Sequence, residues 1–218
     1  MTFDAIASKI GELDLCILGG FNPSGNDPLL PTWCETLLLL GPNDATFWPA
    51  LTKSAEWQDG APDPIDRWSS RAIGGLATSL CAEAIFPFTG PPFAPFYDWA
   101  LKTRALHASP IQMLVHGDMG LLVSIRGALA LRERLTLPPL QKPPCDDCHT
   151  PCASACPVRA FGGGVYDVPK CRSFLKSVGG QDCMTRGCIA RRACPLSKKS
   201  GRYDAHSAYH MRQFSDPK

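Results

Sequence analysis

The cysteines of this 218-residue chain are unevenly distributed, and no other sequence feature constrains its fold and function as strongly. Only Cys16, Cys34 and Cys81 precede residue 140, whereas the other eight of the eleven lie between Cys145 and Cys194. A segment this dense in thiols indicates metal or redox chemistry in a reducing compartment, and disulfide bonds in an oxidising one. The compartment is therefore the first question.

The N-terminal residues do not resemble a secretory signal. A basic opening is absent, and Asp4, Lys9 and Glu12 interrupt any apolar run. The longest apolar stretches, such as residues 37–40, are far too short to span a bilayer. We therefore expect a cytoplasmic protein without a membrane segment, in which the clustered cysteines bind metal.

The first cysteine group has nearly the spacing of a bacterial ferredoxin. Cys145, Cys148, Cys152 and Cys156 form the pattern C-x2-C-x3-C-x3-C-P, which has one residue more than the ferredoxin run before the third cysteine. Three closely spaced thiolates can bind three corners of a cubane. The cysteine that precedes the proline points away and binds a second cluster.

The second cysteine group is looser but ends in the same Cys-Pro step, at Cys194-Pro195. Two groups of four with the same ending favour an exchange of the last cysteine between clusters. The sequence thus predicts two [4Fe–4S] clusters, the first held by Cys145, Cys148, Cys152 and Cys194, and the second by Cys156, Cys171, Cys183 and Cys188. Because this leaves no open iron position, electron transfer is favoured over substrate chemistry at the clusters.

Other uses of eight cysteines compete with this interpretation. Two zinc sites with four cysteines each would also consume eight thiolates, and a disulfide framework is the third option. The repeated Cys-Pro ending and the dense first group favour iron and sulfide. The three remaining cysteines, Cys16, Cys34 and Cys81, are expected to be small buried apolar residues.

The formal net charge of +2 excludes little by itself. Each cluster with its four thiolates adds about −2, so two clusters bring the total to roughly −2. Eight basic residues lie in and around the second cysteine group: Arg172, Lys176, Arg186, Arg191, Arg192, Lys198, Lys199 and Arg202. They form either a solvated face that offsets the clusters, or a docking surface for an acidic redox partner protein or a nucleic acid such as tRNA. Because no aromatic stacking motif accompanies them, nucleic acid is disfavoured.

A proline-rich stretch at residues 137–144 separates two predicted domains, 1–140 and 141–218. Apolar periodicity in the first predicts an α/β (α+β) layer fold. The expected helices are 3–13, 64–82 and 97–106, and the expected strands are 14–18, 36–40, 85–88, 111–115 and 121–125. No phosphate loop, dinucleotide fingerprint or nucleophile elbow occurs there, so we name no catalytic residue. A terminal helix carrying Tyr203, His206, Tyr209 and His210 is expected to pack on the cluster domain.

The run from Leu114 to Leu122, together with the two cysteine groups, resembles the back half of epoxyqueuosine reductases and corrinoid-dependent reductive dehalogenases. That resemblance implies a nitroreductase-like domain, two [4Fe–4S] clusters with exchanged ligation, and cobalamin or another tetrapyrrole as a further cofactor. The chain departs from the family in one turn, where His116-Gly117-Asp118 replaces a Gly-Lys-Asn step, and no residue is matched to the family's proton-donor aspartate.

Four further motifs resemble short iron–sulfur proteins described only as ferredoxin-like: Asp66-Arg67-Trp68-Ser69, Pro87-Phe88-Thr89-Gly90-Pro91-Pro92, Arg126-Gly127-Ala128-Leu129, and Gly187-Cys188-Ile189-Ala190-Arg191-Arg192-Ala193-Cys194-Pro195. We therefore expect a redox protein that relays single electrons to a partner or to a pocket in its own N-terminal domain. The alternatives are a corrinoid-dependent oxidoreductase and a zinc-stapled binding protein without redox activity. The sequence sets no oligomeric state.

Overall fold

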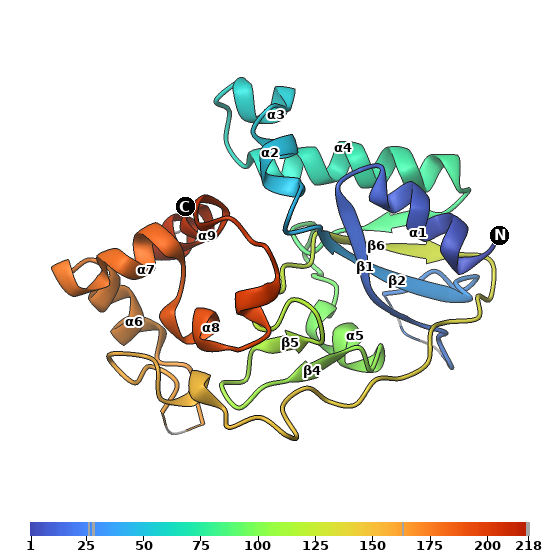
Figure 1. Cartoon of the computed structure of the whole chain (residues 1–218). Helices are drawn as coiled ribbons and strands as arrows, with labels where there is room; N and C mark the ends of the chain where they lie inside the picture. Colours follow the sequence, from blue (N-terminus) through green and yellow to red (C-terminus); the bar gives the residue numbers. More distant parts are fainter. Residues whose placement is uncertain (26, 28, 163, 217–218) are drawn as a thin grey trace. The chain divides into compact units, whose positions relative to one another are not determined.

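The computed structural model describes residues 1–216 except 26, 28 and 163. The chain forms two compact units (Figure 1). The first consists of Met1–Leu106 and Ser124–Gln141, and the second of His107–Val123 and Lys142–Lys218. Helices and antiparallel sheets are both present, which confirms the expected mixed class of α and β structure.

A four-stranded antiparallel sheet is the centre of the first unit. Its strand order is β1 (Leu15–Phe21), β2 (Thr36–Pro42), β6 (Gly127–Leu131) and β3 (Glu83–Ile85). Leu37 to Leu40 of β2 are fully buried, and successive side chains of a strand point to opposite faces. Both faces of the sheet are therefore covered, and this explains the unbroken leucine run.

Five helices complete the first unit: α1 (Phe3–Gly11), α2 (Phe47–Leu51), α3 (Ala55–Gln58), α4 (Pro64–Ser79) and α5 (Phe96–Lys102). The hydroxyl of Thr2 caps α1 by accepting a hydrogen bond from the Ala5 amide at 3.3 Å. Ile6 and Ile10 of this helix are fully buried, and α1 packs against β1. Helix α4 packs against β3 and β6.

Four sequence predictions in this region differ from the structure. Residues 121–125 form no strand, and the strand lies instead at Gly127–Leu131, where it pairs with both β2 and β3. Strand β3 (Glu83–Ile85) overlaps the expected 85–88 segment at Ile85 alone, and α5 ends at Lys102 rather than at residue 106. Of the three cysteines expected to be buried, Cys34 is buried, Cys16 is half-buried and Cys81 is exposed. Cys81 follows the end of α4 in a left-handed conformation with φ 50°.

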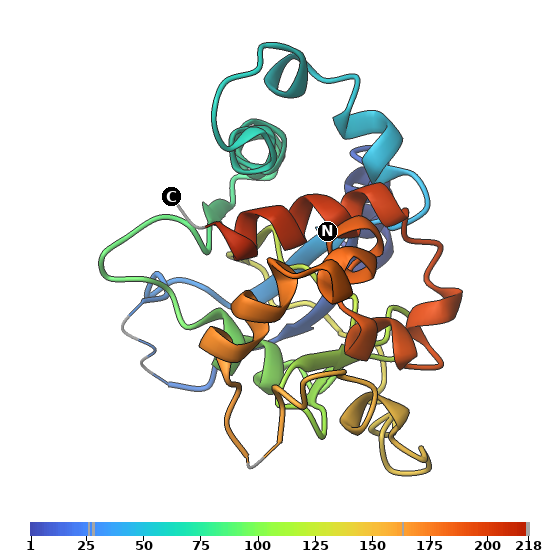
Figure 2. The ribbon, with the colours of Figure 1, turned by 90° about the vertical axis from the view of Figure 1, so that its left-hand side faces the viewer.

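The second unit contains one small sheet and several short helices. Its strands are β4 (Leu106–Ala108, which begins at the last residue of the first unit) and β5 (Leu114–His116). Its helical segments are η1 (Pro151–Ala153), α6 (Val168–Leu175), η2 (Val178–Gly180), α7 (Gln181–Arg186), α8 (Ile189–Ala193), η3 (Ser197–Lys199) and α9 (Asp204–Ser215). Helix α9 packs against α6 and α7, as expected for the terminal helix (Figure 2). Within the described residues, no helix has the length and apolar character to cross a membrane.

Candidate metal centre

The eight clustered cysteines all lie in the second unit, on short segments. Cys145 and Cys148 belong to one turn, in which the Cys148 amide donates to the Cys145 carbonyl at 3.2 Å. Cys152 lies in η1, Cys171 in α6 and Cys183 in α7, while Cys188 and Cys194 flank α8. All eleven cysteines of the chain are free thiols in this structure. The disulfide alternative therefore has no support from the fold.

Four of these cysteines, Cys145, Cys148, Cys152 and Cys194, form the first group. Burial raises the pKa of the Cys145 thiol, and the other three cysteines of the group raise it further by charge repulsion. Burial likewise raises the pKa of Cys152, followed by the charges of Cys194 and Cys148. Such mutual repulsion requires the four sulfurs to lie near one another. These are the four residues that the sequence assigns to the first cluster.

An apolar shell surrounds the first group. Cys152 and Cys194 are 5% and 8% exposed and share a core with Ile111, Val115 and Leu121. Cys145 packs against the same core. Two chain segments far apart in sequence thus enclose these thiols, and the lining excludes water from one side of the group.

The second group consists of Cys156, Cys171, Cys183 and Cys188. Cys171 and Cys183 are buried in a separate apolar core with Leu175 and Met211, and Cys156 and Cys188 pack against it. Burial raises the pKa of Cys171, and the charges of Cys188 and Cys156 raise it as well. This group matches the set that the sequence assigns to the second cluster.

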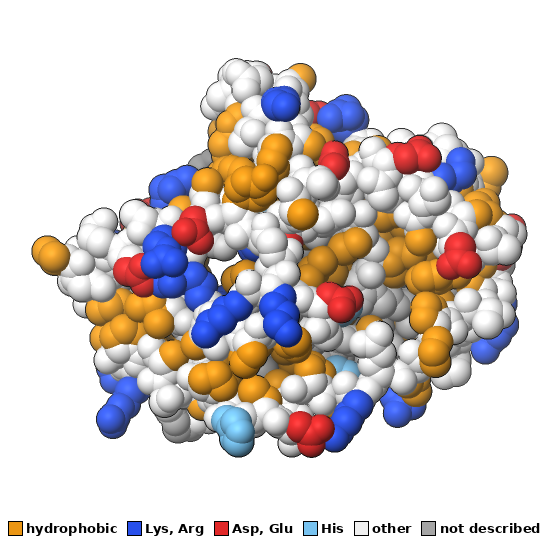
Figure 3. Space-filling model, in the orientation of Figure 1, with side chains coloured by type: hydrophobic (Ala, Val, Ile, Leu, Met, Phe, Trp, Pro, Cys, Tyr) orange, Lys and Arg blue, Asp and Glu red, His pale blue; other side chains and the backbone are white. Residues whose placement is uncertain are grey.

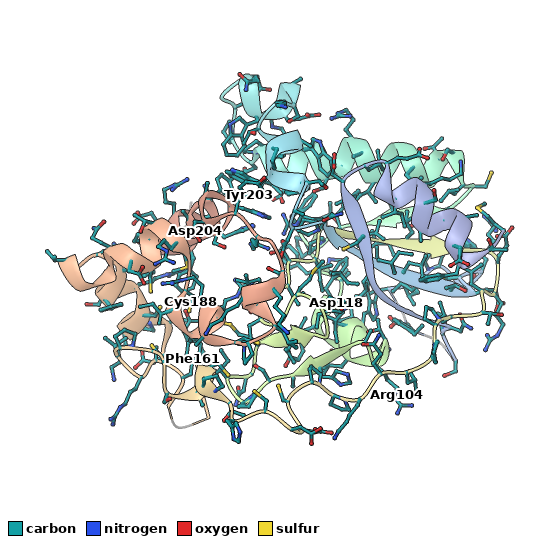
Figure 4. All side chains as sticks on the ribbon, in the orientation of Figure 1. Arg104, Asp118, Phe161, Cys188, Tyr203 and Asp204 are labelled. Atoms are coloured by element: carbon teal, nitrogen blue, oxygen red, sulfur yellow. The ribbon has the colours of Figure 1, made fainter. Side chains whose placement is uncertain are left out.

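The two groups are neighbours. Cys156 and Cys188 pack against both apolar cores, and Phe161 packs with them against the first (Figure 4). Cys156 comes from the first cysteine run but joins the second group, whereas Cys194 comes from the second run and joins the first. Cys194 thus lies in the core of the first group, and Cys156 packs against the cores of both groups.

Backbone amides donate hydrogen bonds to two of the sulfurs. The Thr150 amide lies 3.4 Å from Cys148 Sγ, and the Ala160 amide lies 3.3 Å from Cys156 Sγ. Thr150 has φ 49° and Arg159, directly before Ala160, has φ 51°. The left-handed conformation is costly for residues with a side chain, and such strain is concentrated at functional sites. At both turns an N–H group is directed toward a cysteine sulfur.

The segment from β5 to Val123 forms one wall of the first group, and side chains around α8 hold it in place. Ser197 Oγ accepts from the Leu121 amide at 2.9 Å. Arg191 donates to the carbonyls of Leu121 and Val123 at 2.6 and 3.0 Å, and Arg202 donates to the Leu122 carbonyl at 2.8 Å. These backbone groups therefore bond to side chains instead of to a neighbouring strand, which explains why the predicted strand at 121–125 does not form.

Sequence reasoning missed the role of these side chains. Arg191 and Arg202 are predicted from the sequence only as members of a charged surface, because the local pattern does not show which carbonyls their side chains reach. Two further members of that surface are neutralised locally, since Arg186 and Arg192 both form ion pairs with Asp182. Lys198 and Lys199 remain exposed, and neither has a carboxylate within ion-pair distance in the part of the chain that the structure describes.

The sequence leaves two kinds of metal site open for the eight thiols, zinc sites and iron–sulfur clusters, and these require different distances between sulfurs. A tetrahedral zinc ion with bonds of about 2.3 Å requires sulfurs about 3.8 Å apart. A cubane gives each thiolate its own iron, so the sulfurs stand farther apart. Among the described residues, no group of three or more His, Cys, Asp or Glu side chains is placed to hold a metal ion. The two groups of four thiols supply the number of thiolates that two cubanes would need.

The first unit contains an open cavity of about 630 Å³, in the domain where a pocket was expected without named residues. Its lining includes Phe21, Gly25, Lys102 and Arg104, the last of which is labelled in Figure 4. Asp27, also at the cavity, accepts hydrogen bonds from the Trp99 indole at 2.7 Å and from Lys102 at 3.2 Å. The cavity thus combines the ring of Phe21 with the basic side chains of Lys102 and Arg104 and the Asp27 carboxylate.

Comparison with known proteins adds no identification. The chain matches no protein-family model and no curated protein sequence.

Proposed function

We propose that the second unit binds two [4Fe–4S] clusters and relays single electrons through them. The observation that carries this proposal is the collection of eight cysteines into two groups of four, with Cys156 and Cys194 exchanged between the groups. A cubane requires one thiolate for each of its four irons, so each group supplies a complete set. Complete ligation leaves no iron position for a substrate.

The surroundings of the two groups support electron transfer in particular. Cys156 and Cys188 lie between the two apolar cores, so an electron has a short path from one group to the other. Amide donors to sulfur and partial burial are the features by which proteins adjust cluster potentials. Cys156 and Cys194, the two cysteines that precede a proline, would each bind the cluster held mainly by the other run. Such exchanged ligation would keep both clusters in one module.

The partner that fits this module is an acidic protein that carries one electron at a time. The second unit has thirteen Lys and Arg against seven Asp and no Glu, a formal excess of six positive charges. Two clusters with their thiolates would reduce that excess by about four. Lys and Arg side chains gather over the part of the unit that contains α7 and α8 (Figure 3). Complementary charge on a partner would accelerate docking at low salt.

Metal and sulfide analysis of anaerobically purified protein tests the proposal directly. We expect about eight irons and eight sulfides per chain, with broad visible absorption that bleaches on reduction by dithionite. Low-temperature EPR of the reduced protein should then show signals from reduced clusters. Two zinc ions without sulfide would reject the redox function and leave a zinc-stapled binding protein.

Two cysteine variants separate ligands from core residues. Cys148→Ser should lower the iron content by about half, because it removes one of four ligands of the first cluster. Cys16→Ser is the matched control: Cys16 lies in β1, where its thiol donates to the Gly41 and Pro42 carbonyls at 3.6 and 3.5 Å. Loss of iron from Cys16→Ser would contradict the division between ligand and core cysteines.

A second candidate function is a corrinoid- or tetrapyrrole-dependent reductase, and the cavity of the first unit favours it. In that case a nitroreductase-like first unit would bind the cofactor and the second unit would supply electrons. Hydroxocobalamin binding followed by visible absorption tests this function. Leu101→Trp, which obstructs the cavity, should abolish binding, whereas Leu140→Trp at an exposed site should not. Equal binding by both variants would exclude the cavity as the cofactor site.

A further inference from the structure

The cavity of the first unit lies where the end of strand β1 meets helix α5. Phe21, the last residue of β1, lines it together with residues 101, 102 and 104 around the end of α5. The strand can approach the helix because Gly19 has no side chain: a Cβ atom there would stand 2.8 Å from Thr103 Oγ1. Thr103 is buried, and its hydroxyl donates to the Ala100 carbonyl at 2.6 Å. The turn that carries Arg104 is therefore fixed against the sheet.

The loop that follows β1 is held at two points. The Asn22 side chain donates to the Leu135 carbonyl at 3.2 Å and accepts from the Thr36 hydroxyl at 2.9 Å. Farther along, the Asp27 carboxylate accepts from the indole of the fully buried Trp99 at 2.7 Å. These bonds join the loop to β2, to α5 and to the segment after β6. The walls of the cavity are thus set by the fold itself, as in most small-molecule sites.

The charged side chains of the cavity leave one positive charge in excess. Lys102 lies 3.2 Å from Asp27, so these two charges offset each other. Arg104, labelled in Figure 4, is exposed, and no carboxylate of the described residues lies within ion-pair distance of it. A guanidinium binds planar or tetrahedral anions such as carboxylate and phosphate through two parallel hydrogen bonds. The cavity therefore favours an anionic group beside Arg104.

Apolar surface lies next to this charge. Leu101 is 36% exposed although it belongs to a helix that packs on the sheet, and the Phe21 ring lines the same cavity. The Lys102 ammonium lies 5.6 Å from the centroid of that ring, which orders both side chains. The volume of about 630 Å³ is within the range of small-molecule sites. An apolar body of modest size can thus contact Phe21 and Leu101 while its anionic end reaches Arg104.

We propose that this cavity binds a small organic anion, whose carboxylate or phosphate pairs with Arg104 and whose apolar part packs on Phe21 and Leu101. The inference goes beyond electron relay, because every residue that carries it belongs to the first unit. It also assigns the cavity a ligand class different from a corrinoid. The iron content of the second unit does not enter its test, so either proposal can fail while the other stands.

Isothermal titration calorimetry of the full chain tests the site with phenyl phosphate and with benzyl alcohol, which has a ring but no charge. We expect phenyl phosphate to bind about tenfold more tightly, the size of a hydrogen bond to a charged group. Arg104→Asn should remove that difference without changing the affinity for benzyl alcohol. Asparagine suits position 104 because it tolerates the left-handed conformation found there, φ 55°. Lys53→Gln, which removes an exposed cation of the same unit outside the cavity, should change neither affinity.

Leu101→Ala separates the apolar contribution from the charge. It should weaken the binding of both probes by the same factor, because it removes surface that both rings contact. A loss confined to phenyl phosphate would mean that Leu101 does not contact the apolar part, which would overturn the proposed binding mode.

Other results would also reject the anion site. Equal affinity for the two probes, unchanged binding of phenyl phosphate by Arg104→Asn, or no binding at millimolar concentration would each overturn the inference. If tryptophan fluorescence shows Arg104→Asn to be unfolded, a salt series on the wild type replaces it. Phenyl phosphate binding that does not weaken as the salt concentration rises would then contradict an ion pair. Hydroxocobalamin that binds without competition from phenyl phosphate would assign the cavity to the cofactor instead.

Discussion

Gly120 lies against the sulfur of Cys194. A Cβ atom at Gly120 would stand 3.0 Å from Cys194 Sγ and 2.3 Å from the Ser197 amide nitrogen. Gly120 also has φ 58°, a left-handed conformation that residues with a side chain rarely adopt. The turn after β5 can therefore approach the first cysteine group only because position 120 has no side chain. This contact leads to the first prediction.

Gly120→Ala should destabilise the second unit by about 2 kcal/mol, because the added methyl group must displace backbone at Ser197 and adopt an unfavourable φ. Iron content should fall with it. Gly74→Ala is the matched control, since Gly74 lies within α4 with nothing within 4 Å of an added Cβ. There, higher helix propensity should stabilise the first unit by up to about 1 kcal/mol. Equal iron content in both variants would show that the approach of Gly120 is not required.

Ser197→Ala should cost about 1–2 kcal/mol of stability in the second unit, because it leaves the buried Leu121 amide without its acceptor. The measurement is the denaturant midpoint at which visible cluster absorption is lost. Ser173→Ala, at an exposed position of α6, serves as the control and should leave that midpoint unchanged. An unchanged midpoint in Ser197→Ala would mean that this hydrogen bond contributes no net stability.

The exchange of ligands between the two cysteine runs gives a third prediction. Cys194→Ser should remove the same EPR signal as Cys148→Ser, although Cys194 belongs to the second run of the sequence. Cys156→Ser should remove the other signal, together with Cys183→Ser. If Cys194→Ser and Cys183→Ser affect one signal in common, each cluster is bound by its own run and the exchange is wrong.

A fourth prediction concerns the pH dependence of the first unit. Hydrogen bonds from Arg71 hold the pKa of Glu56 at about 2, below the ordinary value of 4.5. Because the folded-state pKa is the lower one, the stabilisation is complete above pH 4.5 and is lost as the pH falls toward 2. Glu56→Gln should therefore cost about 1 kcal/mol at pH 7 and less at pH 3.5.

Tryptophan fluorescence can measure this effect, because all five tryptophans lie in the first unit. Urea unfolding of the wild type and Glu56→Gln should give midpoints that differ at pH 7 and converge at low pH. Glu12→Gln, at an exposed position of the first unit, is a control for the same change of charge at the surface. A difference between wild type and Glu56→Gln that is constant from pH 7 to pH 3.5 would contradict the assigned pKa.

The local sequence pattern predicted the structure correctly where a segment's own residues determine its conformation. The periodic residues near the N-terminus form α1, the leucine run forms β2, and Asp63-Pro64 begins α4. The local pattern gave wrong predictions where contacts with residues distant in the sequence determine the structure. Residues 121–125 are as apolar as a typical buried strand, but the amide and carbonyl of Leu121 form hydrogen bonds with the side chains of Ser197 and Arg191. Strand β6 was missed because Gly and Ala are weak strand formers, and its pairing with β2 and β3 outweighs that preference.

The sequence by itself determined which cysteines can act as ligands, because close spacing and the Cys-Pro steps are properties of the local chain. The sequence also predicted how these eight cysteines divide into two groups of four. Only the tertiary structure decided that residues 107–123 belong to the second unit, that Gly120 approaches Cys194, and that Tyr166 packs against the core that contains Cys171. These contacts join residues distant in sequence. They depend on how helices and turns pack, and local pattern does not encode that packing.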